Sequence, residues 1–460
     1  MEFEGARTIN DIIDGRPVSR LQALTIILCG LVLFLDGFDT QSIGFLVPPM
    51  AEELHIPVSA FGAMFGAGLF GLMFGTMLGG PIADRWGRKW AIILSGFAFG
   101  VFTSATAGAH TLDRLVLFRF LTGLGLGGAM PNVVALATEY APARLQSTLV
   151  TVMFGGMGGG AVLSGAAGSV LLPIWGWRSV LYLGGLLPLL LVPVLIKVLP
   201  ESVRFLAIRS GDSKQIAEIL GRIAPELSTV VVRPAINEGR VEGIPVKHLF
   251  TSGRAVGTIL LWIPYFMNLL LFYFILSWLP ALLRQVGMPV SAGIAAVTIF
   301  SIGNIIGASL QGRVMTAWGP SRTLFVEFAV TVVLIGILGS ILSSYGLMLI
   351  TTLAIGICVP GAQAGLNALA AMFYPTAIRS TGVGWALGFG RIGSIFGPVL
   401  GGMMLARGWT PQEIFEAGVI PAACAAAAIL VSGAFPTRAS AYRPRVSERH
   451  QQEAIAFNVP

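Results

Sequence analysis

The chain has 460 residues, of which 55% are hydrophobic and only 11% are charged. Soluble domains carry about 25% charged residues, so this composition excludes a soluble protein and predicts an integral membrane protein. The formal net charge of +7 does not indicate nucleic-acid binding, because the basic residues lie in short loops between apolar runs.

The first apolar run, 21–47, contains two carboxylates, Asp36 and Asp39. The run is long enough for a membrane-spanning helix, and residues three apart share a helix face. A carboxylate at the membrane centre costs about 2.5–3.5 kcal/mol, so the pair indicates a proton or cation site facing an aqueous cavity. The alternative is that each Asp binds a neighbouring Arg or Asn and joins two helices. The polar first twenty residues argue against a cleavable signal peptide.

Twelve apolar runs predict an all-α membrane protein with twelve transmembrane helices. The polar segment between the sixth and seventh runs is predicted to be an amphipathic, partly helical cytoplasmic linker. The expected organisation is an N-terminal six-helix bundle (1–199), the linker (200–253) and a C-terminal six-helix bundle with a cytoplasmic tail (254–460). The predicted spans are 21–47, 58–82, 90–109, 113–138, 146–172, 178–198, 255–280, 290–312, 322–343, 346–371, 380–405 and 412–435.

Lys and Arg are concentrated in the loops on one side of the predicted membrane, and such loops are typically cytoplasmic. This asymmetry predicts that both termini are cytoplasmic. The opposite side holds only four basic residues: Arg114, Arg178, Arg284 and Arg407.

The two predicted bundles repeat each other in sequence. Gly80 and the Trp86-Gly87 pair follow the second span, and Gly312 and the Trp318-Gly319 pair follow the eighth at the same spacing. A second repeat relates the loops that begin at Pro142 and Pro375, each followed by Arg, Ser and Thr. Parallel six-helix repeats place a substrate between the halves, near the midplane of the membrane.

Arg119 and Arg391 lie well inside apolar spans four and eleven, one in each half. A guanidinium cannot lose its charge, and its fork binds a carboxylate in a bidentate manner. We therefore expect Arg391, and with it Arg119, to attract a substrate carboxylate, while Asp36 and Asp39 carry the proton. The alternatives are an ion pair of Arg119 with Asp36 or Asp39, and bonding of Arg391 to backbone carbonyls.

Other polar and aromatic side chains in the spans are expected to line the cavity, where a ring stacks on aromatic groups and amides bind ring hydroxyls. The alternatives are lipid contact for the aromatic residues and interhelical hydrogen bonds for the amides. These substrate-binding candidates are Phe65, Tyr265, Asn268, Asn304, Gln363 and Asn367.

A further group of charged residues lies at the predicted membrane edge, and is expected to form a cytoplasmic gate. It comprises Asp84, Arg85, Arg88 and Lys89, with Glu139, Arg144 and Arg379 as candidate partners.

The Gly-rich stretch 123–128 resembles a dinucleotide-binding loop but follows no strand, so we interpret it as a site of close helix packing. The three cysteines and four histidines show no metal or disulfide spacing, so no metal or other cofactor is expected.

Four motifs resemble those of known transporters. The stretch from Gly80 to Lys89 resembles the loop signature of the major facilitator superfamily: Gly, three residues, Asp-Arg, one residue, Gly-Arg-Lys. Arg119, four residues before Gly123, is similar to the fourth-helix Arg motif of that superfamily. The Pro-Glu-Ser stretch at 200–202 is similar to a motif of sugar and organic-ion carriers. The Asp-Gly-Phe-Asp stretch at 36–39 resembles the signature of aromatic acid:proton symporters.

This resemblance covers nearly the whole chain and implies the major facilitator fold, with two pseudo-symmetric six-helix bundles. It implies import of a benzoate-type aromatic carboxylate with protons, by alternating access, across a bacterial cytoplasmic membrane. We expect a monomer in the lipid bilayer, with no nucleic-acid partner. In the second half, Thr316 and Ala317 stand where Asp84 and Arg85 stand in the first, so the gating charge is expected to be asymmetric. The family's functional residues map onto Asp36, Asp39, Arg119, Glu139, Arg379 and Arg391.

Three other functions were weighed against this one. The Pro-Glu-Ser stretch also suits a sugar or polyol carrier, which leaves the intramembrane Arg in each half unexplained. An exporter would carry a Gly-Pro motif in the fifth span, but the Gly-rich stretch 155–160 has no Pro after it. A membrane enzyme or receptor would show a catalytic constellation or an extramembrane domain. The chain is therefore predicted not to be an enzyme.

Overall fold

The computed structural model describes residues 13–14, 17–207, 213–223, 247–251, 253–375 and 378–434, and these residues contain helices and no strand. Most of the predicted linker and the whole predicted tail after residue 434 lie outside the described residues. The long elements are α2 (Arg20–Leu54), α3 (Phe61–Trp86), α4 (Arg88–Ala107), α5 (Leu112–Tyr140), α6 (Ala143–Val198), α10 (Ala255–Gln285), α11 (Val290–Trp318), α12 (Pro320–Ile341), α13 (Tyr345–Phe373), α14 (Arg379–Ala406) and α16 (Val419–Ala434). The short ones are η1 (Val58–Ala60), α7 (Val203–Phe205), α8 (Ser213–Ile223), α9 (Lys247–Phe250) and α15 (Pro411–Ala417).

Eleven helices of the described residues are long and apolar enough to cross a membrane. One of them, α6, is 56 residues long and has a non-helical backbone at Gly176, with φ 72° and ψ −179°. Glycine adopts this positive φ without a Cβ penalty. The predicted spans 146–172 and 178–198 lie on the two sides of Gly176. The eleven helices therefore provide the twelve predicted crossings.

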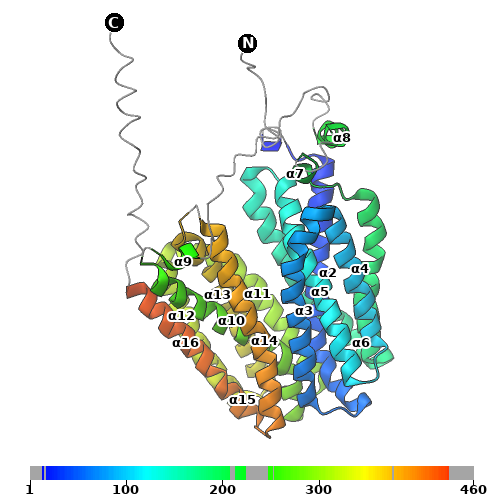
Figure 1. The fold of residues 1–460 in the computed structure, drawn as a ribbon. Coiled ribbons are helices and arrows are strands. Elements are labelled where there is room, and N and C mark those ends of the chain that lie inside the picture. Colours follow the sequence, from blue (N-terminus) through cyan, green and yellow to red (C-terminus); the bar gives the residue numbers. More distant parts are fainter. Residues whose placement is uncertain are drawn as a thin grey trace, which may run out of the picture.

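The helices form two bundles, α2–α6 and α10–α16, as Figure 1 shows. The sequence repeat between them has a structural counterpart. Gly87 and Gly319 end α3 and α11 with φ of 97° and 84°, and each follows an exposed Trp. Both glycine N–H groups donate to the carbonyl four residues earlier. Corresponding helices of the two halves, α3 and α11, therefore end with the same glycine conformation and the same backbone hydrogen bond.

Glycines bring helices of one bundle into close contact. A Cβ added at Gly123 would overlap the carbonyl oxygen of Gly68, and one at Gly127 would overlap that of Leu72. The predicted close packing of the 123–128 stretch is confirmed, because these glycines let α5 lie directly against α3. Small residues serve this purpose in membrane helices generally.

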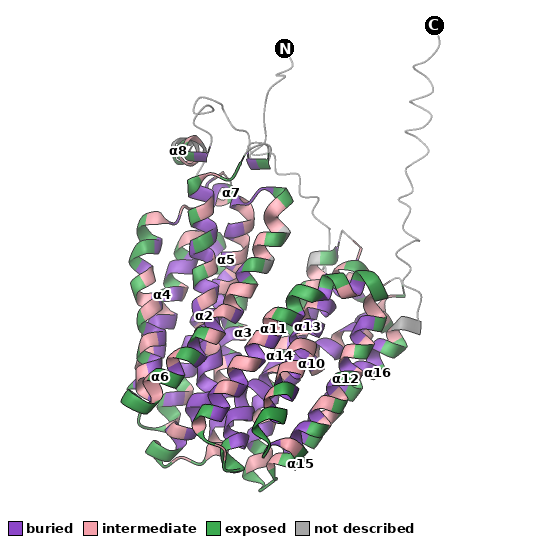
Figure 2. Ribbon diagram, turned by 180° about the vertical axis from the view of Figure 1, so that it is seen from behind, coloured by how far each residue is buried: buried purple, intermediate pink, exposed green. Residues whose placement is uncertain are grey.

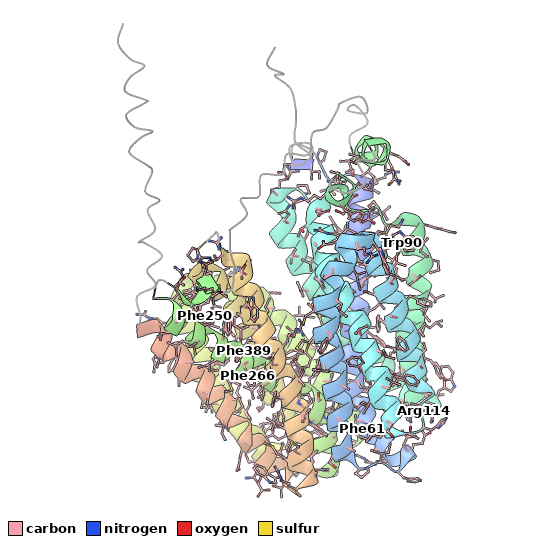
Figure 3. All side chains as sticks on the ribbon, viewed as in Figure 1. Phe61, Trp90, Arg114, Phe250, Phe266 and Phe389 are labelled. Atoms are coloured by element: carbon pink, nitrogen blue, oxygen red, sulfur yellow. The ribbon has the colours of Figure 1, made fainter. Side chains whose placement is uncertain are left out.

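Among the described residues, the halves share a hydrophobic core at one end of the molecule. The end next to α15, here called the closed end, has a hydrophobic core shared by both halves, which includes Trp278 of α10 and Phe61 at the start of α3. Phe61 is labelled in Figure 3. An ion pair of 3.0 Å between Arg284 and Glu52 also crosses there. The opposite end, here called the linker end, carries α7, α8 and α9, and its cores are separate in the two halves. The bundles diverge toward that end in both views (Figures 1 and 2).

Candidate functional site

A cavity of about 60 Å³ lies between the halves. The N-terminal half provides its charged residues, Asp39 and Arg119, and α10 of the other half provides Tyr273, Leu276 and Ser277. The remaining lining residues are Thr40, Ile43, Met64, Phe65, Gly68, Leu69, Leu72, Thr122, Gly123 and Leu126. A mostly apolar wall with a few convergent polar groups is typical of a small-molecule site.

Asp39 and Arg119 form a buried ion pair on the wall of this cavity. Arg119 Nη1 donates to Asp39 Oδ2 at 2.9 Å, and the two side chains are 6% and 3% exposed. Thr103 of α4 donates to the other carboxylate oxygen at 3.1 Å. The alternative of an ion pair between Arg119 and a first-helix acid is therefore the arrangement seen. Removing one partner of such a pair leaves an uncompensated charge, which is strongly unfavourable.

Asp36 lies one helical turn earlier on α2 and is also buried. Its Oδ1 accepts a hydrogen bond of 3.0 Å from Thr40. Gly37, between the two acids, lies against α6 so closely that a Cβ would overlap the carbonyl oxygen of Met157. This packing holds the acid pair in the interior of the bundle rather than at a lipid-facing surface.

Arg391 of α14 is half-buried and contacts both halves. Its Nη1 donates to the Tyr273 hydroxyl at 3.2 Å, and its Nη2 lies 3.7 Å from the sulfur of Met130 on α5. Tyr273 lines the cavity, so Arg391 contacts a cavity-lining residue without lining the cavity itself. The second intramembrane arginine therefore has only neutral partners among these contacts.

The amide candidates of the C-terminal half form a network between α10 and α13. Asn268 Nδ2 donates to the Val359 carbonyl at 3.1 Å and to Gln363 Oε1 at 3.0 Å, and Tyr265 donates to Asn367 Oδ1 at 2.9 Å. These are interhelical hydrogen bonds, the alternative to substrate binding for these amides. Gln363 and Asn367 are only half-buried, so each keeps part of its surface for other contacts.

The two remaining substrate-binding candidates differ in position. Phe65 lines the cavity, and its ring meets that of Trp278 edge to face, with centroids 5.6 Å apart. Asn304 is half-buried on α11 and is not among the residues that line the cavity.

Two of the predicted gate residues, Arg88 and Glu139, form an ion pair at the linker end of the N-terminal half. Ser202 donates to the other Glu139 oxygen at 2.6 Å, and Glu201 Oε1 accepts from the backbone N–H of Lys89 at 3.1 Å. Burial raises the pKa of the Glu201 carboxyl, and the N–H groups that bind it oppose that shift. The Pro-Glu-Ser stretch thus ties the end of α6 to α4 and α5.

Of the other gate candidates, two are exposed and two bind backbone carbonyls. Asp84 and Arg85 are exposed on the last turn of α3. Arg144 donates to the Asp14 carbonyl at 3.3 Å, and Arg379 donates to the Tyr374 carbonyl at 3.4 Å. Among these hydrogen bonds none joins the two halves.

Four hydroxyl-bearing residues of the site are not among those predicted from the sequence: Thr40, Thr103, Thr122 and Ser277. Thr122 follows Arg119 by three positions, so the shared helix face was a usable signal. Thr103 reaches Asp39 from a different helix, which no local pattern reveals. Within the described residues, no group of three or more His, Cys, Asp or Glu is arranged to hold a metal ion.

Comparison with known proteins agrees with this architecture. The family model of the Major Facilitator Superfamily matches residues 29–334 and 261–457. The 4-hydroxybenzoate transporter PcaK of Acinetobacter baylyi is 40% identical over 91% of this chain and 93% of its own length. The gallate transporter of Pseudomonas putida is 39% identical over 94% and 96%, respectively.

Among solved structures, the inward-open xylose transporter XylE of E. coli superimposes with a TM-score of 0.70 at 20% identity, covering 90% of this chain and 96% of its own. A D-xylose–proton symporter superimposes with a TM-score of 0.69 at 17% identity, covering 89% and 97%. These structures share the fold.

The chain belongs to the Major Facilitator Superfamily, and it is a membrane transporter rather than an enzyme. Within that superfamily it falls among the aromatic-acid carriers, as the relatives with about 40% identity show.

Proposed function

We propose that this protein imports a benzoate-type aromatic carboxylate together with a proton, by alternating access of the cavity between its halves. The observation that carries this proposal is the buried Asp39–Arg119 ion pair on the cavity wall. The names of the relatives support the substrate class. An ionisable pair in a membrane interior is by default a functional site.

The ion pair suggests how the proton and the substrate are coupled. Protonation of Asp39 removes its charge and releases Arg119 Nη1, the donor that Asp39 now occupies. A substrate carboxylate then compensates the guanidinium in place of Asp39. The site holds one positive and one negative charge before and after this exchange. The halves can therefore close over the loaded site without burying an unpaired charge, which would oppose closure. Asp36, one turn away, is the proposed second proton carrier.

Several residues are proposed to orient the substrate. Arg391 attracts the carboxylate into the cavity and holds the Tyr273 hydroxyl. Phe65 stacks on the ring. The half-buried amides Gln363, Asn367 and Asn304 bind ring hydroxyls. Asn268 orients Gln363, and Tyr265 orients Asn367.

The linker end is proposed to face the cytoplasm of a bacterial cell, with both termini on that side of the cytoplasmic membrane. The separate cores at that end then describe a carrier open to the inside. Return to the outward-open state closes the linker end, where Asp84, Arg85, Arg88, Lys89, Glu139, Arg144 and Arg379 are the proposed gate. We propose that the monomer is the transporting unit, since one chain contains the whole cavity.

Uptake by purified protein in liposomes tests the proposal. Labelled 4-hydroxybenzoate should accumulate when the outside is acidic, and a protonophore should stop the accumulation. Benzoate should compete and glucose should not. Accumulation that survives collapse of the proton gradient would overturn proton coupling, while competition by glucose alone would favour a sugar carrier.

A further inference from the structure

The hydroxyl of Thr122 behaves differently from most other buried hydroxyls of the chain. Thr25, Thr106 and Ser301 each donate to the carbonyl four residues earlier in their own helix, at 2.8 Å. Thr122 is 1% exposed, and its Oγ1 has no hydrogen-bond partner among the described residues. Thr122, which lines the cavity, therefore makes neither this bond nor a side-chain bond such as that of Thr40 to Asp36 in the described part of the chain.

Arg119, one turn earlier on α5, also has unused donors. Its Nη1 binds Asp39, while its Nε and Nη2 are buried without a partner in the described part of the chain. Buried donors that lack a partner lose the hydrogen bonds they would make in water. Three such atoms, two on Arg119 and one on Thr122, stand on the same helix face beside one cavity.

We propose that Thr122 is a specificity-determining residue, whose hydroxyl joins the free Nε and Nη2 of Arg119 to form the subsite for the substrate carboxylate. The inference rests on the proposed function and adds a residue to it. A carboxylate offers two oxygens with several lone pairs, so it satisfies the guanidinium edge and the hydroxyl together. Protonation of Asp39 releases Arg119 Nη1, which then becomes a further donor to the substrate carboxylate.

The surrounding wall suits the rest of such a substrate. Phe65, Leu69, Leu72 and Leu126 line the cavity next to these donors and present apolar surface to a ring. A neutral amide analogue of the same shape carries no negative charge and only one acceptor oxygen, and its NH2 group places donors against the donors of the subsite. The subsite therefore discriminates charge and not only shape.

The test compares Thr122→Val, which keeps the shape and removes the hydroxyl, with Thr122→Ser, which keeps the hydroxyl. Thr106→Val is the matched control, because Thr106 is equally buried but its hydroxyl is bound to the Phe102 carbonyl. Purified full-length variants are compared for the Kd of benzoate and of benzamide. The KM and maximal rate of benzoate uptake, and the melting temperature, are measured on the same preparations.

Thr122→Val should raise the Kd and KM for benzoate about 10- to 100-fold, the size of one hydrogen bond to a charged group. The Kd for benzamide and the maximal rate should change much less, and Thr122→Ser should restore benzoate binding. Unchanged benzoate binding in Thr122→Val, or an equal loss for benzamide, would overturn the inference and leave the proposed function standing. Absence of benzoate binding and uptake in the wild-type protein would instead overturn the proposed function.

Discussion

The two halves meet at the same cavity but supply different chemistry. The N-terminal half holds a fully buried ion pair, Asp39 with Arg119, and a threonine hydroxyl that supports the carboxylate. The C-terminal half supplies Arg391, which is half-buried and contacts the neutral Tyr273 and Met130, and a network of amides.

This difference separates two tasks. A buried charge pair is sensitive to the loss of one charge, because the partner is left without compensation. A substitution in a neutral network removes single hydrogen bonds, and the loss of each one costs less free energy than an unpaired buried charge. We therefore expect the N-terminal half to control coupling, through the ion pair that also receives the carboxylate, and the C-terminal half to contribute smaller amounts of affinity and stability.

The largest effect is expected for Asp39→Asn, which leaves the buried Arg119 without a counter-charge. Proton-driven uptake should fall at least about 100-fold, and the free energy of unfolding should fall by about 3–5 kcal/mol. Liposome uptake and thermal melting measure the two effects. The second substitution in Asp39→Asn/Arg119→Gln should restore stability but not uptake.

Asp113→Asn, an exposed acid-to-amide change at the start of α5, is the control for Asp39→Asn and should leave uptake intact. Accumulation against a gradient by Asp39→Asn would contradict the assignment of coupling to the N-terminal half.

Arg391→Gln is expected to act on affinity rather than on coupling. Loss of the cation beside Tyr273 should raise the KM for benzoate about 10-fold, while the uptake that remains stays dependent on the proton gradient. Arg407→Gln, at an exposed position after α14, is the matched control. If Arg391→Gln abolished proton dependence and left the KM unchanged, the division between the halves would be wrong.

Asn268→Leu should lower the stability of the C-terminal half without removing a charge. Asn268 Nδ2 binds the Val359 carbonyl and Gln363, so its loss should reduce the stability by about 1–3 kcal/mol. Melting of the purified protein should show this decrease, and the KM should change less than in Arg391→Gln. Gln412→Leu, exposed on α15, should melt like the wild type. A larger loss of affinity than of stability would make Asn268 a direct substrate ligand.

The smallest effect is expected for Glu52→Gln at the closed end. The Glu52–Arg284 pair joins the halves but is exposed, and such pairs contribute about 0–1 kcal/mol. Loss of the pair should raise the equilibrium constant for opening of the closed end by no more than about 5-fold. Alkylation of a Ser277→Cys reporter by a membrane-impermeant reagent applied from that side measures this change. Glu416→Gln on α15 should have no effect, and a reduced alkylation rate in Glu52→Gln would contradict a bridging role for the pair.

Local sequence was sufficient for most of the fold. Apolar runs are long and continuous because every membrane-spanning backbone must satisfy its own hydrogen bonds in a helix. The repeated Trp-Gly pairs, at Gly87 and Gly319, mark equivalent helix ends because only glycine adopts their backbone freely. The gate remains a prediction: Arg88 and Glu139 pair within one half, and the hydrogen bonds of Arg144 and Arg379 to backbone carbonyls do not join the two halves.

The sequence by itself determined that Asp36, Asp39, Arg119 and Arg391 are functional candidates, because charge within an apolar run is expensive wherever the helix lies. Only the tertiary structure decided that Arg119 binds Asp39, that the Thr122 hydroxyl beside it has no hydrogen-bond partner among the described residues, and that the hydrophobic cores of the halves are separate at the linker end. Such choices depend on how each helix is rotated and packed against the others. Contacts between residues distant in sequence determine that rotation, and no local periodicity contains it.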